Sequence, residues 1–299
     1  MYNGEIIDSH MHLWDLKNNY HWLNNNIPEF EQLIGNYDSL RHNFFPNDYK
    51  ELVKNHKITQ SVHVQAFGFP DNPVGETKWL QEQANRYGFP HGIVAFANLA
   101  DPNVEIILEQ HAKLANIRGI RMPLNYHETP YRRMADRGDY MWDKQWRKGF
   151  ALLANYNFSF DVQIYDHQIK DLITLAEVFP HITMIVEHFA WPTDLSPHGF
   201  ELWQKRIASL VKFPNILMKL SGIGCVFQHL QAKQVSSYID VAVRSLGVDQ
   251  CMFGSNCPPD TLFYKFDELI ALYKNALLKF SKEDQYKLFF LNAKRTYRL

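Results

Sequence analysis

Short apolar runs rich in β-branched residues alternate with amphipathic stretches along all 299 residues of the chain. Short apolar runs bounded by turn residues are typical of buried strands, and a period of 3.6 residues is typical of helices. The pattern predicts eight strands, at 5–12, 60–66, 92–98, 117–122, 158–164, 182–188, 215–221 and 250–256. It predicts nine helices, at 47–56, 76–87, 103–115, 142–155, 167–179, 201–213, 231–246, 260–278 and 282–294.

This regular alternation indicates parallel strands joined by helical crossovers. Eight strand-then-helix units are the number that closes a barrel, and the chain length of 299 residues suits one barrel. We therefore expect an α/β fold, a (β/α)8 TIM barrel with long βα loops over the active face, as a single domain over 1–299. An open doubly wound sheet is the alternative, but no glycine-rich dinucleotide fingerprint follows the first strand.

Three connections that follow strands are longer than turns. Residues 13–46 are rich in Trp, Tyr and Phe, residues 123–141 carry several Arg and Tyr, and residues 189–200 contain Trp191-Pro192. In a (β/α)8 barrel such loops lie on the catalytic face, so we expect 13–46 and 123–141 to cover a pocket there. The alternative for any single aromatic residue is that it only packs on the scaffold.

Composition limits the partners that this chain is expected to have. A formal net charge of −1 gives no electrostatic case for nucleic acid or an anionic membrane surface. Aromatic residues make up 14% of the chain and many fall in the loops, which favours a pocket for a small organic substrate. Whether copies of the chain form a homo-oligomer stays open.

The cysteine content and the apolar runs bear on the compartment. The three cysteines, Cys225, Cys251 and Cys257, are odd in number and lack the spacing of a zinc site, so we expect no disulfide framework. The N-terminal residues resemble a strand rather than a signal peptide, and no apolar run approaches the 18 residues of a membrane span. We expect a cytoplasmic protein.

Candidate chemistry begins at the first predicted strand. Alternation along a strand would point Asp8, His10 and His12 to one side. A strand rises about 3.3 Å per residue, so two residues separate His10 from His12 by a distance over which both imidazoles can reach one ion. Imidazole is a common ligand of zinc and similar metals. The alternative is a pair of histidines that holds a loop and binds no ion.

Other polar residues fall near the ends of later strands, where a barrel places its active site. They are His63, Gln65, Arg121, Asp161, Gln163, Tyr165, His188, Lys219, Ser221 and Asn256. His188 directly follows an apolar run, where a histidine is unexpected, and it could complete a three-histidine set with the first strand. His63 could instead be a hydrogen-bonded core residue, and Lys219 could be a member of a structural ion pair.

Seven weak motifs follow one another in order over nearly the whole chain. They are Ile7-Asp8-Ser9-His10-Met11-His12-Leu13-Trp14-Asp15, Val62-His63-Val64-Gln65-Ala66, Arg118-Gly119-Ile120-Arg121, Val186-Glu187-His188, Lys219-Leu220-Ser221-Gly222, Met252-Phe253-Gly254-Ser255-Asn256 and Asn292-Ala293. In this order they resemble the amidohydrolase superfamily, in particular the amidohydrolase 2 branch of metal-dependent TIM-barrel hydrolases that includes sugar-lactone lactonases.

The resemblance implies that His10, His12 and His188 are the ligands of a divalent metal, with zinc the leading expectation. In metal-free members the same histidines would donate to the substrate carbonyl. It also implies a carboxylate at the end of strand eight that acts as general base. That position holds Asn256, and an amide cannot accept a proton at neutral pH, although its oxygen can ligate a metal or position water.

These expectations lead to a hydrolase of a small cyclic ester, a sugar-type or carboxylated lactone, by metal- or histidine-assisted attack of water. The expected catalytic residues are His10, His12, His188 and Asn256, and the expected substrate-binding residues are His63, Gln65, Arg121, Lys219 and Tyr165. Asp161 or Asp260 could replace the missing base, although Asp260 also stands where the eighth helix needs an N-cap. Amide hydrolysis, decarboxylation and a weakly active ligand-binding barrel remain alternatives.

Overall fold

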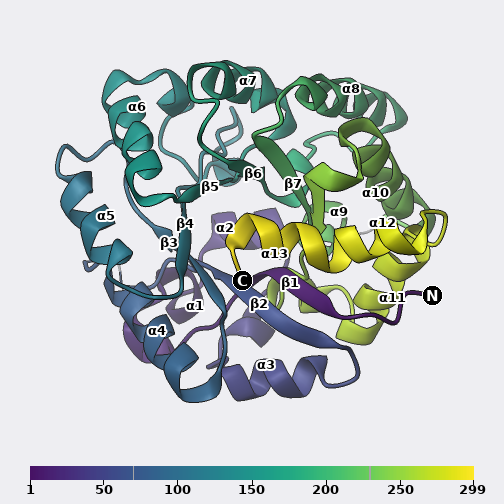
Figure 1. The fold of residues 1–299 in the computed structure, drawn as a ribbon, viewed down its shortest axis with the longest axis horizontal. Helices are drawn as coiled ribbons and strands as arrows, with labels where there is room; N and C mark the ends of the chain where they lie inside the picture. The colour runs from purple at the N-terminus through teal and green to yellow at the C-terminus, as the bar shows by residue number, and fades with distance from the viewer. Residues whose placement is uncertain (70, 229) are drawn as a thin grey trace.

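The structure is a computed structural model that describes residues 1–69, 71–228 and 230–299. Its eight strands are all parallel and follow chain order in one sheet (Figure 1). They are β1 (Ile6–Met11), β2 (Ile58–Val64), β3 (Gly92–Phe96), β4 (Ile117–Arg121), β5 (Ser159–Val162), β6 (Met184–Val186), β7 (Ile216–Leu220) and β8 (Cys251–Phe253). The predicted (β/α)8 fold and all eight predicted strands are confirmed.

The residues that follow β8 close the sheet onto β1. Met11 and Cys257 form a parallel bridge, and the backbone N–H of Asn256 donates to the His10 carbonyl oxygen over 2.8 Å. The closure places Asn256 beside the histidines of strand one.

Helices surround the barrel at the predicted places. They are α3 (Pro46–Val53), α4 (Gly75–Tyr87), α5 (Val104–Ala112), α6 (Lys144–Ala151), α7 (Ile169–Val178), α8 (Pro197–Ala208), α10 (Ala232–Leu246) and α11 (Phe266–Ala276). The predicted helix 282–294 is three consecutive pieces, α12 (Lys282–Tyr286), a π-helical turn (Lys287–Leu291) and α13 (Asn292–Tyr297). The short helices α1 (His21–Asn24), α2 (Pro28–Ile34) and α9 (Ile223–Phe227) were not predicted.

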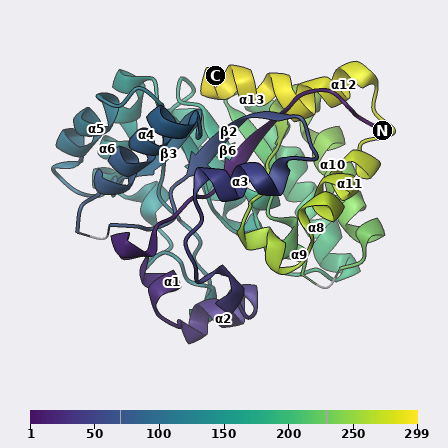
Figure 2. The same ribbon diagram turned by 90° about the horizontal axis from the view of Figure 1, so that it is seen from below.

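The two ends of the barrel are covered by different segments. At the amino-terminal end of the strands, inward-facing residues such as Ile7 and Met252 form one buried cluster with Tyr297 of α13. Figure 2 shows α1 and α2 projecting from the opposite side of the barrel to α13. The carboxyl ends of the strands therefore open beneath α1 and α2, where a (β/α)8 barrel places its active site. Within the described ranges, no helix is both long and apolar enough to cross a membrane.

Candidate active site

A bulge in β1 aims the first two histidines into the barrel. The pairing of β1 with β2 shifts register between Asp8 and Met11, and such a bulge reverses the alternation of the side chains that follow it. Asp8 therefore lies outside the barrel, where its carboxylate accepts from the Tyr49 hydroxyl at 2.9 Å and from the Ser255 amide at 2.8 Å. The expectation that Asp8 shares one face with His10 and His12 is wrong, because simple alternation took no account of the bulge.

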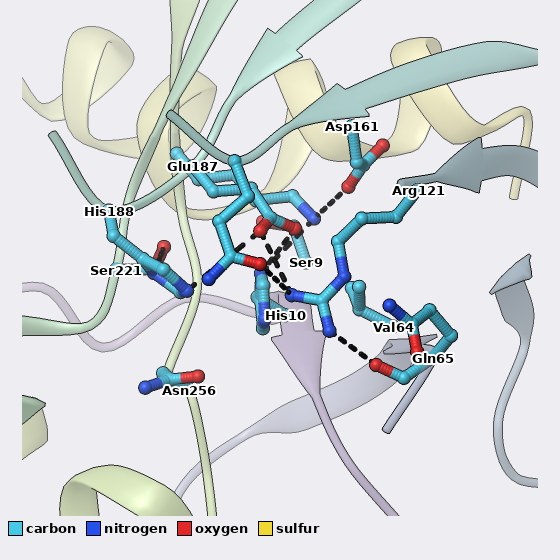
Figure 3. A network of polar contacts seen from close by, with 12 residues as sticks. Ser9, His10, Val64, Gln65, Arg121, Asp161, Glu187, His188, Ser221 and Asn256 are labelled. Carbon is cyan, nitrogen blue, oxygen red and sulfur yellow. Dashed lines mark hydrogen bonds and ion pairs between the residues drawn. The ribbon is translucent and has the colours of Figure 1, made fainter. Parts of the chain in front are cut away.

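The three predicted histidines meet at the carboxyl ends of the strands, and Figure 3 shows His10, His188 and Asn256 there. The ring centroid of His10 lies 5.0 Å from that of His12 and 4.6 Å from that of His188. His12, His188 and Asn256 line a cavity of about 480 Å3, and His10 lies buried beside them. The structure thus brings the predicted catalytic residues together, while their catalytic roles remain a prediction.

A carboxylate that the sequence reasoning did not assign joins this group. Glu187 Oε1 lies 3.4 Å from His10 Nδ1, and Glu187 Oε2 lies 3.9 Å from His188 Nε2. Ligand atoms of His10, Glu187 and His188 all lie within 4.8 Å of one another, as ligands of one metal ion would. The sequence signal was the position of Glu187 directly before His188, at the end of the apolar run of strand six.

The residues present fit a divalent cation at this point. His10 Nε2 and Glu187 Oε1 are buried and have no hydrogen-bond partner within the described part of the chain. Two imidazole nitrogens and one carboxylate oxygen are a donor set that suits a zinc-class ion. The predicted ligand His12 is not in this group, because its Nε2 faces Asn256 instead.

Two buried ion pairs lie beside the histidines. Arg121 Nη1 pairs with Glu187 Oε2 at 3.0 Å, and Lys219 Nζ pairs with Asp161 Oδ2 at 2.5 Å, where the Tyr297 hydroxyl also donates. The two cations and two anions balance, which is how a protein interior tolerates buried charge. The alternative that Lys219 belongs to a structural ion pair is supported, and Asp161 is fully engaged by its partners.

Burial keeps the three histidines neutral. It lowers the pKa of His10, His12 and His188 well below the usual 6.5, and the positive charges of Lys219 and Arg121 add to the effect on His10 and His188. His12 Nδ1 lies 2.7 Å from the Val64 carbonyl oxygen, so Nδ1 carries the proton of the neutral ring. His12 Nε2 therefore presents a lone pair.

Asn256 presents a second acceptor to the same point. Its Nδ2 donates to Asp260 Oδ1 over 2.9 Å, which turns its Oδ1 toward His12 Nε2 at 3.3 Å. Two acceptors that face each other repel unless a donor or a cation lies between them. This pair of atoms, His12 Nε2 and Asn256 Oδ1, is called the acceptor pair below, and it is built to hold a water molecule or an ion.

Asp260 does not cap the eighth helix, as was considered from the sequence. The eighth barrel helix, α11, begins at Phe266, so Asp260 is not its N-cap. Its carboxylate instead accepts from the amides of Gly224 at 3.0 Å and Cys225 at 3.1 Å, in the first turn of α9. Burial raises the pKa of Asp260 to about 6. Asp260 contacts the site indirectly, by the hydrogen bond that it accepts from Asn256.

The five predicted substrate-binding residues are not equally placed. Arg121 lines the cavity, whereas His63, Gln65, Lys219 and Tyr165 are not among its described lining residues. His63 Nδ1 accepts from the Leu13 amide at 3.0 Å, as expected of a hydrogen-bonded core histidine.

Tyr165 is not among the described lining residues of the main cavity. It donates to the Arg132 carbonyl oxygen over 2.6 Å and lines a neighbouring cavity of about 350 Å3. Its predicted role as a substrate-binding residue has no contact in the main cavity to support it.

Glu76, at the start of α4, is a second carboxylate that the sequence reasoning missed. It is buried, lines the cavity and accepts from the Ala66 amide at 3.0 Å. Burial raises its pKa from 4.5 to about 7, which the nearby Arg121 charge partly opposes. A carboxyl with a pKa near 7 changes its protonation at physiological pH. No motif marked Glu76, because it belongs to a helix and not to a strand end.

Backbone conformation also shapes the site. His188, Phe189, Ala190 and Trp191 have φ angles of 52°, 59°, 55° and 35°, a left-handed run that L-residues adopt at a cost of roughly 1–2 kcal/mol each. Gly222 allows this turn to pack, because a Cβ there would lie 2.5 Å from His188 Nδ1. Backbone strain of this kind is concentrated at functional sites.

The barrel and its strand-end histidines define a class of protein, the (β/α)8 enzymes with a polar site at the carboxyl ends of their strands. Within that class the chain belongs to the amidohydrolase family, whose model, described as "Amidohydrolase", matches residues 7–299. The earlier resemblance to this family is confirmed.

Individual relatives are consistent with this assignment. An uncharacterized protein, y4mH, of Sinorhizobium fredii is 35% identical over 98% of both chains. An L-fucono-1,5-lactonase of Burkholderia ambifaria is 22% identical over 88% of this chain and 83% of its own. The crystal structure of a Burkholderia multivorans amidohydrolase with bound zinc superposes with a TM-score of 0.82, at 22% identity, over 99% of this chain and 100% of its own.

Proposed function

We propose that the protein hydrolyses a small lactone by attack of water on the ring carbonyl at the mouth of the barrel. The acceptor pair carries this proposal. A water molecule that donates one hydrogen to His12 Nε2 and the other to Asn256 Oδ1 keeps its lone pairs free to attack a carbonyl in the cavity.

His12 supplies the base that Asn256 cannot. Its Nε2 accepts the proton of the attacking water and passes it to the ring oxygen as the acyl C–O bond breaks, which gives the open hydroxy acid. Nδ1–H remains bonded to the Val64 carbonyl oxygen and keeps the ring in place. The lowered pKa of His12 makes it a weak base, so the water needs further activation. A zinc-class ion bound by His10, Glu187 and His188 would lower the pKa of water and polarise the carbonyl.

His188 offers a second way to polarise the carbonyl oxygen. Its Nδ1 lies 2.9 Å from the Ser221 hydroxyl, and when that hydroxyl donates, Nε2 carries the ring proton and can donate to a substrate. This arrangement serves hydrolysis without a metal.

The relatives support a lactone as the substrate. Two of the relatives, from Burkholderia ambifaria and Burkholderia multivorans, are named L-fucono-1,5-lactonase, at 22% and 23% identity. Opening a lactone also needs less acid catalysis than cleaving an amide, because an alkoxide leaves more readily than an amine anion. A site with one weak base is therefore better suited to esters.

The test is a panel of lactones and matched lactams assayed with a pH indicator, on untagged protein whose metal content is measured. We expect lactones to be opened and lactams to be untouched. His188→Asn should lower the lactone rate by about 100-fold or more, whereas His198→Asn, at an exposed position on α8, should match the wild type. Hydrolysis of lactams with no opening of lactones would overturn the proposal.

A further inference from the structure

The cavity has a polar floor and apolar walls. The floor consists of His12, Arg121, His188 and Asn256 at the strand ends. Above it, six large apolar or aromatic side chains come from the βα loops and β3. They are Phe67, Phe69, Phe96, Tyr131, Met134 and Trp191.

Residues 21–34, which contain α1 and α2 and are called the lid here, form the outer wall. Trp22, Ile27, Phe30, Leu33 and Ile34 of the lid all line the cavity. The Trp22 indole donates to the Ala66 carbonyl oxygen over 2.9 Å, and the Phe30 ring lies 5.1 Å from that of Trp22. The lid is thus fixed to the end of strand two, and its apolar side chains line the cavity. Figure 2 shows α1 and α2 of the lid projecting from the barrel.

Polar side chains are few on the walls: Glu76 and Gln163 are buried, whereas His21, Glu29 and Arg133 are exposed. Arg121 donates through Nη1 and Nη2 to Glu187, to Gln163 and to the Gln65 carbonyl oxygen, so its charge is already paired with a carboxylate and only its Nε lacks a partner among the described residues. Arg133, the other lining cation among the described residues, is exposed and donates to the carbonyl oxygens of His127 and Glu128. Among the described lining residues, a substrate carboxylate would meet Glu76 and no buried cation that lacks a carboxylate partner.

We propose that the preferred substrate is a neutral lactone with an apolar alkyl or aryl substituent, whose ring carbonyl lies on the floor and whose substituent lies under the lid. This inference rests on the proposed function. Hydroxyls of a sugar lactone would lose water and gain few partners on such walls, which lowers affinity. The volume of about 480 Å3 also falls within the range of about 300–1,000 Å3 that holds drug-sized ligands, and a bare lactone ring would leave most of it unfilled.

The test compares kcat/KM for neutral δ-lactones with side chains from methyl to octyl, for a phenyl-substituted δ-lactone, for an aldonolactone and for a carboxylated lactone. Each buried methylene should raise kcat/KM about fourfold until the cavity is filled. The aldonolactone and the carboxylated lactone should lie below the longer alkyl lactones. An aldonolactone or carboxylated lactone that exceeds every apolar lactone would overturn the inference.

Variants of the wall test the same point. Phe67 has a φ of 62°, which Asn tolerates, so Phe67→Asn should fold while it removes an apolar wall residue. Phe67→Asn and Phe30→Ala should each reduce the amount by which kcat/KM rises as the alkyl chain of the lactone becomes longer. Asn26→Ala, at an exposed lid position outside the cavity lining, should keep the wild-type increase. An unchanged increase in both wall variants would contradict the inference.

Binding separates failure of this inference from failure of the proposed function. Calorimetry with octyl- and hydroxyl-substituted δ-lactams, which the enzyme should not open, reports the preference of the cavity alone. Tighter binding of the octyl lactam without opening of any lactone would support the apolar preference and overturn the hydrolysis. Rapid opening of aldonolactones together with tighter binding of the hydroxylated lactam would support the hydrolysis and overturn the apolar preference.

Discussion

The hydrogen bond between Asn256 and Asp260 sets the orientation of the amide that stands at the end of strand eight in place of a carboxylate. A carboxylate is still close to this position, because Asp260 lies four residues further along the chain and accepts from Asn256 Nδ2 at 2.9 Å. Asp260 thereby fixes which end of the Asn256 amide faces His12. Asn256 itself has a φ of 52°, a conformation that Asn and Asp tolerate better than other L-residues.

Asn256→Asp alone would put two carboxyls in contact. Such a pair shares a proton, so one of its two pKa values rises well above that of a free carboxyl, and burial already raises the pKa of Asp260. Carboxyls with raised pKa values stabilise the fold below those values and lose that contribution as pH rises through them. We expect the melting temperature of this variant, relative to the wild type, to fall as the pH rises from 5 to 8. A difference in melting temperature that does not change with pH would contradict the contact between the two carboxyls.

The exchange Asn256→Asp with Asp260→Asn should avoid this repulsion. It moves the carboxylate into the cavity and keeps an amide as its partner. We expect metal content and lactone turnover to rise together, because the site gains an anionic ligand and a proton acceptor. If the double variant folds and both quantities stay at the wild-type level, the missing carboxylate does not limit this enzyme.

Glu76 should make stability depend on pH. Its pKa is about 7 in the folded protein against 4.5 for a free carboxyl, so the protonated form stabilises the fold and the benefit is lost as pH rises from about 4.5 to 7. Glu76→Gln should therefore gain on the order of 3 kcal/mol relative to the wild type between pH 4.5 and pH 8. Urea unfolding measures the difference, with Glu109→Gln on the exposed face of α5 as control. A constant difference would show that folding does not raise the pKa of Glu76.

At the scale of elements, two irregular segments create the site. The bulge in β1 aims His10 and His12 inward, and the left-handed turn at 188–191 places His188 opposite them, with Trp191 6.0 Å from its ring. Neither segment is regular secondary structure. Regular alternation alone would have placed Asp8 with the histidines.

Gly222→Ala tests whether the packing of β7 against the turn positions His188. A Cβ at Gly222 would collide with the His188 ring at 2.5 Å, and a displacement near 1 Å can cost about 100-fold in rate. Gly88→Ala is the matched control, since Gly88 has a φ of 74° close to the 71° of Gly222 and no atom within 4 Å of its added Cβ. Both variants should lose stability through the left-handed φ, Gly222→Ala more because of the collision, and only Gly222→Ala should lose activity. Equal activities would show that His188 does not depend on this contact.

The sequence predicted regular elements well and the contacts between distant residues poorly. Periodicity is local, so all eight strands and the meeting of His10, His12 and His188 at the barrel mouth could be read from the chain. The bulge could not, because it depends on the pairing partners of β1. The pairing of Arg121 with Glu187 was also hidden, since 66 residues separate them.

The lid shows a second limit of sequence reasoning. Residues 13–46 were expected to cover the pocket, which the lining residues Trp22 and Phe30 confirm, as Tyr131 and Arg133 confirm it for 123–141. The helices α1 and α2 themselves were missed, because with 4 and 7 residues they are too short to show a helical period.

At the scale of the whole molecule, the candidate metal group links distant parts of the barrel. His10 belongs to β1, and Glu187 and His188 follow β6, so an ion bound by them would tie opposite sides of the mouth together. Zinc at 100 times its Kd should add about 2.7 kcal/mol to the stability of the fold, and a chelator should remove it. Calorimetric scans should show a zinc-dependent rise in melting temperature for the wild type and a smaller one for Glu187→Gln. An equal rise in both would place zinc elsewhere.

The acceptor pair is the centre of the proposed chemistry, and His12→Gln tests it most directly. Glutamine keeps a polar side chain at the position but has no basic nitrogen to accept the proton of the attacking water. The measurement is kcat for opening of a neutral lactone by the wild type and by His12→Gln, on folded protein of equal metal content. A fall of about 10²–10⁴-fold is the predicted result. A kcat equal to that of the wild type would contradict the account, because the water would then be activated without His12.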